Sequence, residues 1–97
     1  MQLATVLGQV VATVKEPKLG LFTLLLVQDA VDADVTQPGG AVYVAVDQSG
    51  AGTGEVVLVA RGGAARAAVG PDVPTDRAVV AIVDSVVRAG EVTYQKA

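Results

Sequence analysis

The sequence predicts one small all-β domain, and three features carry that prediction. Valine and alanine make up most of the 52% hydrophobic residues, and the branched side chain of valine packs well on a pleated sheet. Short apolar runs alternate with clusters of glycine, proline and aspartate, a spacing typical of strands joined by turns. A length of 97 residues suits one domain rather than two, so residues 1–97 are expected to form a single domain.

The first predicted strand is long and curved, and it spans Leu3–Val14. Its even-numbered positions are all small and apolar, as the inside of a narrow barrel requires, whereas its odd-numbered positions are mixed. Gly8 lies within this run, and a glycine inside a strand often marks a bend or a bulge. A charged loop, Lys15–Gly20, follows it.

The next two predicted strands are Leu21–Gln28 and Ala41–Val46, joined by the polar connection Asp29–Gly40. Leu21–Gln28 is apolar on both faces, and a short apolar run is also compatible with a helix. Its length and the turn-forming residues on either side favour a strand. The connection ends in Pro-Gly-Gly and is predicted to be a hairpin loop.

The fourth predicted strand, Val56–Ala60, has no polar side chain. A half-exposed strand alternates apolar and polar residues, so a strand without alternation is expected to be covered on both sides. Because a chain this short has little material for that purpose, the pattern points to neighbouring copies of the same chain. A Gly-Gly step and a very short helix follow, and Gly70-Pro71 is expected to end that helix.

The fifth predicted strand spans Ala78–Val87, and Glu91–Tyr94 forms a short terminal strand or tail. Five strands, with one short helix before the last of them, indicate a five-stranded OB-like β-barrel that is partly closed.

Composition excludes several classes of function. A net charge of −3 and only three aromatic residues argue against nucleic-acid binding, which needs basic grooves and stacking platforms. No apolar run approaches the roughly 20 residues of a membrane span, and the N-terminus lacks the basic region of a signal peptide. The mean hydropathy of +0.53 therefore predicts a subunit interface. The absence of cysteine fits a cytosolic protein, and the absence of cysteine and histidine removes thiolate and imidazole ligands.

Two glycine-rich segments invite a ligand-binding interpretation. Gly50–Gly54 has the spacing G-x-G-x-G and precedes a strand, whereas a dinucleotide fingerprint needs G-x-G-x-x-G before a helix. Gly62-Gly63 does open the short helix, between Arg61 and Arg66, but it lacks the Lys and Ser/Thr of a P-loop. A turn is the favoured interpretation of both, and anion binding is the alternative for the second.

The carboxylates predict no catalytic or metal site. Asp29, Asp32 and Asp34 lack the spacing and closing glutamate of a calcium loop, so a solvated loop is expected. Three further aspartates lie at or near strand ends, and turn capping or pairing with Arg61, Arg66 or Arg77 is expected of them: Asp47, Asp76 and Asp84. No cofactor is predicted.

An ordered set of motifs resembles a known family. The second half of the chain resembles the EutN/CcmL family of vertex proteins from bacterial microcompartment shells, through AVD…GAGTGEVVLV…RGGAAR from Ala45 onward, followed by PTDRAVVAIVD. The first half agrees, since two of its segments look like that family's first two strands: GQVVATVKEPKLG and LLLVQ. The resemblance covers nearly the whole chain, although Gly63 stands where serine is common. It implies an OB-like barrel without catalytic residues that assembles into pentamers. These would cap the vertices of a cytoplasmic microcompartment shell, a carboxysome or a metabolosome, tiled by hexameric or trimeric shell proteins.

Under this interpretation, the residues expected near subunit contacts or the fivefold axis are Arg61, Gly62, Gly63 and Arg66, with the arginines pairing with a neighbour's Asp47, Asp76 or Asp84. Two alternatives remain open at the level of sequence. One is a small OB-like barrel that binds an anion or another ligand through the Gly62–Arg66 turn. The other is an accessory subunit of an enzyme complex.

Overall fold

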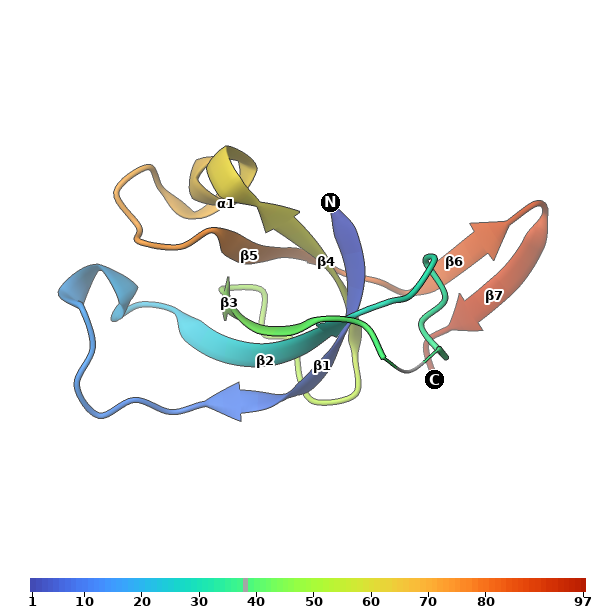
Figure 1. Cartoon of the computed structure of the whole chain (residues 1–97), viewed down its shortest axis with the longest axis horizontal. Coiled ribbons are helices and arrows are strands. Elements are labelled where there is room, and N and C mark those ends of the chain that lie inside the picture. The colour runs from blue at the N-terminus through green and yellow to red at the C-terminus, as the bar shows by residue number, and fades with distance from the viewer. Residues whose placement is uncertain (38) are drawn as a thin grey trace.

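The structure, a computed structural model, describes residues 1–37 and 39–97 and is dominated by strands (Figure 1). Pro38, in the predicted hairpin connection, lies outside the described residues. The elements in chain order are β1 (Gln2–Val10), η1 (Pro17–Leu19), β2 (Thr23–Asp29), β3 (Val42–Asp47), β4 (Val56–Arg61), α1 (Gly62–Val69), β5 (Arg77–Ile82), β6 (Ser85–Arg88) and β7 (Glu91–Gln95).

Five of these strands close into a barrel with the order β1-β2-β3-β5-β4. Neighbouring strands are antiparallel except β3 and β5, which run parallel. The short helix α1 precedes β5, the last barrel strand. The prediction of a five-stranded barrel with one short helix before its last strand is therefore confirmed, although the barrel is closed and not partly closed as predicted.

Two apolar clusters hold the barrel together. The first fills its interior with side chains such as Val6, Val27, Val57 and Val59, and full burial of a valine contributes roughly 1.5–3 kcal/mol. The second lies under α1, where Ala65 packs with three residues from the outer surface of the strands: Val46, Ala60 and Ala78. The chain thus covers part of the barrel's outside with its own helix.

This helix corrects one expectation. Val57 and Val59 of β4 belong to the interior cluster and Ala60 to the cluster under α1, so the chain itself buries the inner face of this strand and the end of its outer face. The burial of Ala60 is therefore explained by α1, whereas Leu58 on the same strand stays partly exposed, so the expectation of a neighbouring copy applies at most to Leu58. Exposed valines and leucines occur elsewhere, at Leu7, Val11, Val14, Leu21, Val42, Val44, Val87 and Val92.

A bulge corrects the prediction for the first strand. The register with β2 shifts between Val6 and Gly8, and one extra residue turns every later side chain to the opposite face. Val6 pairs with Val27, a core residue, whereas Val10 pairs with Leu24, whose side chain packs in the cluster under α1. The predicted single apolar face therefore holds only before the bulge, and the strand ends at Val10 rather than Val14.

The predicted strand Ala78–Val87 is two strands. β5 ends at Ile82, and β6 begins at Ser85 and pairs only with β7 in a separate two-stranded sheet. The β6–β7 hairpin projects from one end of the barrel (Figure 1) and gives the molecule extents of 44 × 24 × 22 Å. The end of α1 is as expected, since Gly70 follows it with φ +132°, a conformation that favours glycine.

Candidate subunit interface

The predicted interface residues meet where β4 passes into α1. Arg61 ends β4, and Gly62 begins the helix with φ +57°, a left-handed conformation that glycine adopts at little cost. The Gly62 amide donates a 2.9 Å hydrogen bond to the Asp76 carbonyl. This bond joins the start of the helix to the loop that precedes β5.

Arginines gather around this junction. Arg61 lies opposite Arg77 in the β4–β5 register. The Arg77 Nη1 donates to an Asp76 carboxylate oxygen at 3.1 Å, and its guanidinium lies 4.9 Å from the centre of the Tyr43 ring, a distance at which cation–π attraction operates. We call the set Arg61, Arg66, Asp76 and Arg77 the arginine corner.

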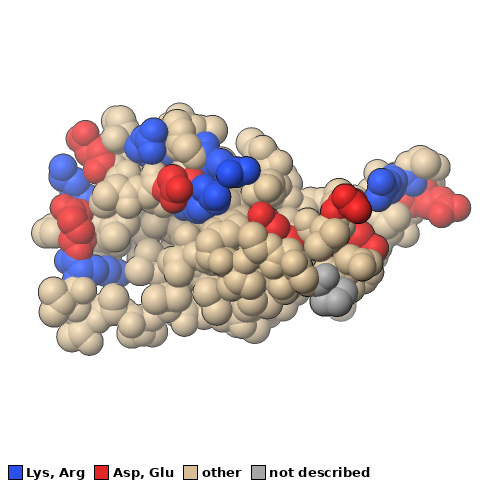
Figure 2. All heavy atoms as spheres, in the orientation of Figure 1, with Lys and Arg blue, Asp and Glu red and all other residues tan. Residues whose placement is uncertain are grey.

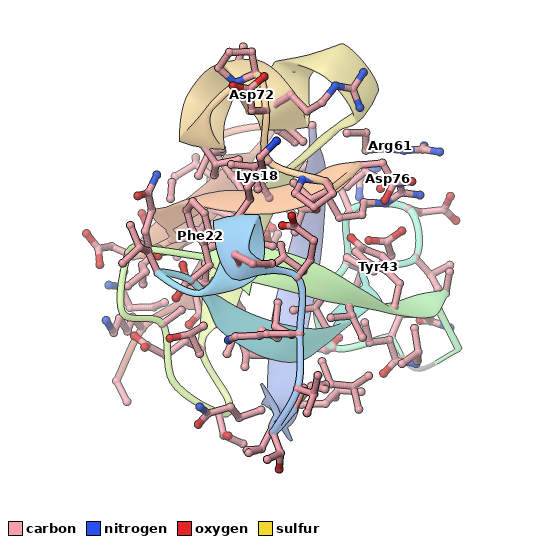
Figure 3. All side chains as sticks on the ribbon, turned by 90° about the vertical axis from the view of Figure 1, so that its left-hand side faces the viewer. Lys18, Phe22, Tyr43, Arg61, Asp72 and Asp76 are labelled. Carbon is pink, nitrogen blue, oxygen red and sulfur yellow. The ribbon has the colours of Figure 1, made fainter. Side chains whose placement is uncertain are left out.

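The arginine corner is largely exposed. Figure 3 shows Arg61 and Asp76 next to each other at the edge of the barrel, with Tyr43 below them. The Arg66 guanidinium approaches the Thr75 carbonyl at 3.4 Å, a long and weak hydrogen bond. Gly63 is also exposed, and a Cβ at this position would meet no atom within 4 Å.

Asp47 plays a different part. It is 2% exposed, and its carboxylate accepts hydrogen bonds from the amides of Ser49 (2.9 Å), Gly50 (3.1 Å) and Ala51 (3.0 Å) as well as from the Ser49 hydroxyl. This is the turn capping expected from the sequence. Because the carboxylate is buried and fully engaged, Asp47 is unsuited to pairing with an arginine of another copy.

Asp84 lies away from the arginine corner. It follows the far end of β5 from Arg77, and its carbonyl accepts from the Lys96 amide at 2.7 Å. The structure therefore brings Arg61, Gly62, Gly63, Arg66 and Asp76 together but separates them from Asp84.

The glycine loop before β4 forms turns. Gly50 and Gly54 have φ values of +81° and +88°, and a Glu55 carboxylate oxygen accepts from the Gly52 amide at 2.7 Å. The interpretation of Gly50–Gly54 as turn-forming residues is confirmed.

The aspartates of the connection between β2 and β3 act separately. Asp29 accepts a 2.6 Å hydrogen bond from the Tyr43 hydroxyl. Burial, and then this bond to a carboxylate, raise the pKa of Tyr43 far above its ordinary value. Asp34 accepts from the amide and hydroxyl of Thr36, and the hydroxyl bond is the main cause of its lowered pKa. No cluster of three potential metal ligands occurs in residues 1–37 and 39–97.

Two surface hollows lie outside the arginine corner. One, of about 210 Å³, lies between the loop after β3 and the end of α1, and is lined by Gln48, Ser49, Ala68, Val69, Val79 and Val80. The other, of about 380 Å³, lies beside the N-terminus and is lined by Met1, Gln2, Leu3, Ala30, Ala33 and Leu58. Neither is lined by residues of the Gly62–Arg66 turn, the segment considered for anion binding.

Sequence reasoning missed an uncharged surface on β2 and β3. Figure 2 shows charged side chains at the α1 end and on the β6–β7 hairpin, whereas the face over β2 and β3 is free of them. Val42 and Val44 of β3 are exposed on this face, and Val44 lies opposite Leu26 of β2. The apolar runs of both strands indicated a large apolar surface, but the sequence did not show that α1 would leave this part of the barrel uncovered.

No helix in the described part of the chain has the length and apolar character of a membrane span.

Comparison with known proteins identifies the family. A family model described as ethanolamine utilisation protein EutN/carboxysome matches residues 1–84. The chain is 44% identical to the bacterial microcompartment shell vertex protein EutN of Salmonella typhimurium over 97 residues, which cover 99% of this chain and 96% of that one. It is 50% identical to the carboxysome shell vertex protein CcmL of Synechocystis, with coverage of 99% and 95%.

Solved structures agree. The EutN crystal structure from Escherichia coli has a TM-score of 0.86 at 43% identity, covering 98% of this chain and 97% of that chain. A GrpN pentameric microcompartment shell protein from Rhodospirillum rubrum has a TM-score of 0.78 at 39% identity, covering 92% and 100%. With a family model that matches most of its length and relatives that align over nearly all of it, the chain belongs to the EutN/CcmL family.

Proposed function

We propose that this chain is a structural shell protein that forms homopentamers and caps the vertices of a polyhedral bacterial microcompartment in the cytoplasm. The observation that carries the proposal is its likeness to the pentameric GrpN shell protein, all of whose chain is covered at a TM-score of 0.78. Relatives that align with 99% of the chain are named shell vertex proteins.

The proposed role is geometric rather than catalytic. A closed icosahedral shell requires fivefold vertices, and a ring of five identical chains supplies one through head-to-tail contacts that close on themselves. The proposed partners of this ring are the hexameric or trimeric shell proteins that tile the facets around it.

The arginine corner is the proposed charged part of the subunit contact, or of the surface near the fivefold axis. Its support is local: Arg61 and Arg66 are exposed, and Asp76 is exposed beside them. In a ring, such a patch meets its own copies only around the fivefold axis and otherwise meets a different surface of the next copy, and its charges fix the register of association more than they add affinity.

The mass of the assembled protein tests the proposed function. Native mass spectrometry at micromolar concentration is expected to show a species of five chains. A chain that stays monomeric under these conditions would overturn the vertex assignment.

Charge reversal at Arg66 tests the arginine corner. Arg66→Glu is expected to weaken the pentamer because it puts a negative charge where the arginine is proposed to pair with a carboxylate of the next copy, so that dissociation is detected at a higher protein concentration. Lys18→Glu, the same reversal at another exposed site in η1, is the matched control. An unchanged five-chain mass for Arg66→Glu at low concentration would remove this residue from the interface.

A further inference from the structure

The β6–β7 hairpin, Ser85–Gln95, is an arm that the barrel does not cover. Its strands pair only with each other, and Figure 1 shows it extending away from the barrel. Polar links within the described residues tie it to the barrel side of the chain: Arg88 Nη1 donates to the Asp32 carbonyl at 3.2 Å, and Nζ of Lys96, the residue after the arm, lies 2.7 Å from a Glu55 carboxylate oxygen. The Lys96 amide also donates to the Asp84 carbonyl, which closes the hairpin at its base.

The arm exposes an apolar pair. Val87 and Val92 lie directly opposite each other across the two strands, and they are 61% and 58% exposed. A two-stranded hairpin without a hydrophobic face packed on something else is marginally stable in water. Within residues 1–37 and 39–97, the arm therefore lacks the packing that normally holds such a hairpin.

The surface area of the chain points in the same direction. Its accessible surface is 5628 Å², whereas a compact monomer of 9.7 kDa is expected to expose about 5100 Å². The excess of about 500 Å² is a large part of the roughly 800 Å² that each partner buries in a standard stable interface. An extended arm that folds onto a neighbour would remove this excess.

The uncharged face over β2 and β3 is a suitable surface to receive the arm. Val42 and Val44 are 51% and 44% exposed there, and Leu26 lies beside Val44 in the adjacent strand. The arm and this face are different surfaces of the same chain. A ring needs such a pair, because each head-to-tail contact joins one surface to a different one on the next copy.

We propose that the β6–β7 arm of one copy packs its Val87–Val92 pair against the β2–β3 face of the next copy and so fastens the ring. This inference rests on the proposed function, since it assumes a ring of identical chains. The family model ends at Asp84, one residue before β6. The relatives EutN and CcmL nevertheless align with 99% of this chain, so these relatives share the arm, which on this proposal adds to the area of contact between copies.

A double variant with isosteric side chains tests the arm. Val87→Thr with Val92→Thr keeps the β-branched shape that suits a strand but puts hydroxyl groups into the proposed contact. The dissociation constant of the five-chain species is expected to rise by about tenfold or more. Val14→Thr, at an exposed valine outside the arm, is the control and is expected to leave dissociation unchanged.

The outcomes of this experiment are distinct. A natural chain that does not form five-chain species overturns the proposed function and the arm together. A pentameric natural chain, with a double variant that dissociates at the same concentration, overturns the arm alone.

Disulfide trapping tests the receiving face, and the natural chain contains no cysteine that could interfere. Val92→Cys combined with Val44→Cys, and separately with Val42→Cys, is expected to form covalent ladders between copies on oxidation, because a disulfide needs Cα atoms within about 7 Å. Val92→Cys combined with Lys18→Cys is the control. If neither valine position cross-links in the assembled protein, the β2–β3 face is not the receiving surface.

Discussion

The barrel and the β6–β7 arm both contain apolar strands, but they differ in how far the chain itself buries the apolar side chains. The barrel buries apolar side chains within the chain, where Val57 and Val59 are fully buried and α1 covers Ala60 on the outer side of β4. The arm carries Val87 and Val92 at its surface, and in the described part of the chain no helix or third strand covers them. An apolar strand in this molecule is thus either buried within its own chain or exposed and available for contact with another copy. Only the burial of its side chains distinguishes the two cases.

The difference in burial predicts different effects of substitutions in the two regions. Substitutions inside the barrel are expected to alter the free energy of unfolding of the single chain. Substitutions in the arm are expected to alter mainly the affinity of one copy for the next. The following substitutions test this division, beginning with the largest expected effect.

Gly40→Ala is expected to be the most damaging change. A Cβ at Gly40 would lie 1.8 Å from the Asp29 carbonyl oxygen, so the backbone between β2 and β3 would have to move. The cost in free energy of unfolding is about 3 kcal/mol, measured by chemical denaturation at fixed concentration. Gly8→Ala, where a Cβ meets nothing within 4 Å, is the control within the barrel, and a similar loss there would refute the steric explanation.

Matched valine truncations compare the two regions directly. Val57→Ala removes two methyl groups from the closed interior and is expected to cost about 2 kcal/mol. Val92→Ala in the arm is expected to cost less than about 0.5 kcal/mol when both are measured on dissociated chains. Equal losses would show that the arm is as firmly packed in the single chain as the barrel, and would contradict the division.

The tip of the arm offers a stabilising change. Ala89 has φ +50° and precedes Gly90 with φ +80°, and a left-handed conformation costs an alanine about 1–2 kcal/mol. Ala89→Asn creates the Asn-Gly sequence preferred in such hairpin turns. Slower amide hydrogen exchange is expected in β6 and β7, with no change in the barrel, and slower exchange in both regions would mean that arm and barrel open together.

The smallest effect concerns the ion pair at the base of the arm. The hydrogen bond from Lys96, and then the Gly52 amide, lower the pKa of Glu55. A lowered pKa contributes stability above the ordinary glutamate value, near 4.3, and this contribution is lost as the pH falls through the lowered value. Lys96→Gln is expected to raise the pKa of Glu55 toward that ordinary value, which a carboxyl NMR titration would detect. An unmoved pKa would show that Lys96 does not hold the arm to Glu55 in solution.

Much of the barrel was predictable because glycine and proline mark its turns and valine runs mark its strands. The Asp47–Ala51 turn and the end of α1 at Gly70 followed from local chemistry. Two strand boundaries did not. A valine-rich run such as Ala78–Val87 does not reveal where the chain leaves one sheet for another, since both sheets accept the same residues.

The candidate interface was only partly predictable for a similar reason. Arg61, Gly62, Gly63 and Arg66 are neighbours in sequence, so their grouping with one another follows from the turn. Asp47, Asp76 and Asp84 depend on tertiary structure, which buries the first, brings the second to the corner and places the third beyond the far end of β5. The sequence pattern also could not show that the bulge at Leu7 reverses the later part of β1.

The position of β5 has a consequence for how the chain folds during its synthesis. β5 is the last barrel strand to leave the ribosome, yet it lies between β3 and β4. Until it is inserted, those two strands present open edges on which other chains can pair. Because β1 must also find β4 far along the sequence, closure depends on distant contacts and is expected to be slow. The nascent chain therefore remains open to mispairing until nearly all of it has been made.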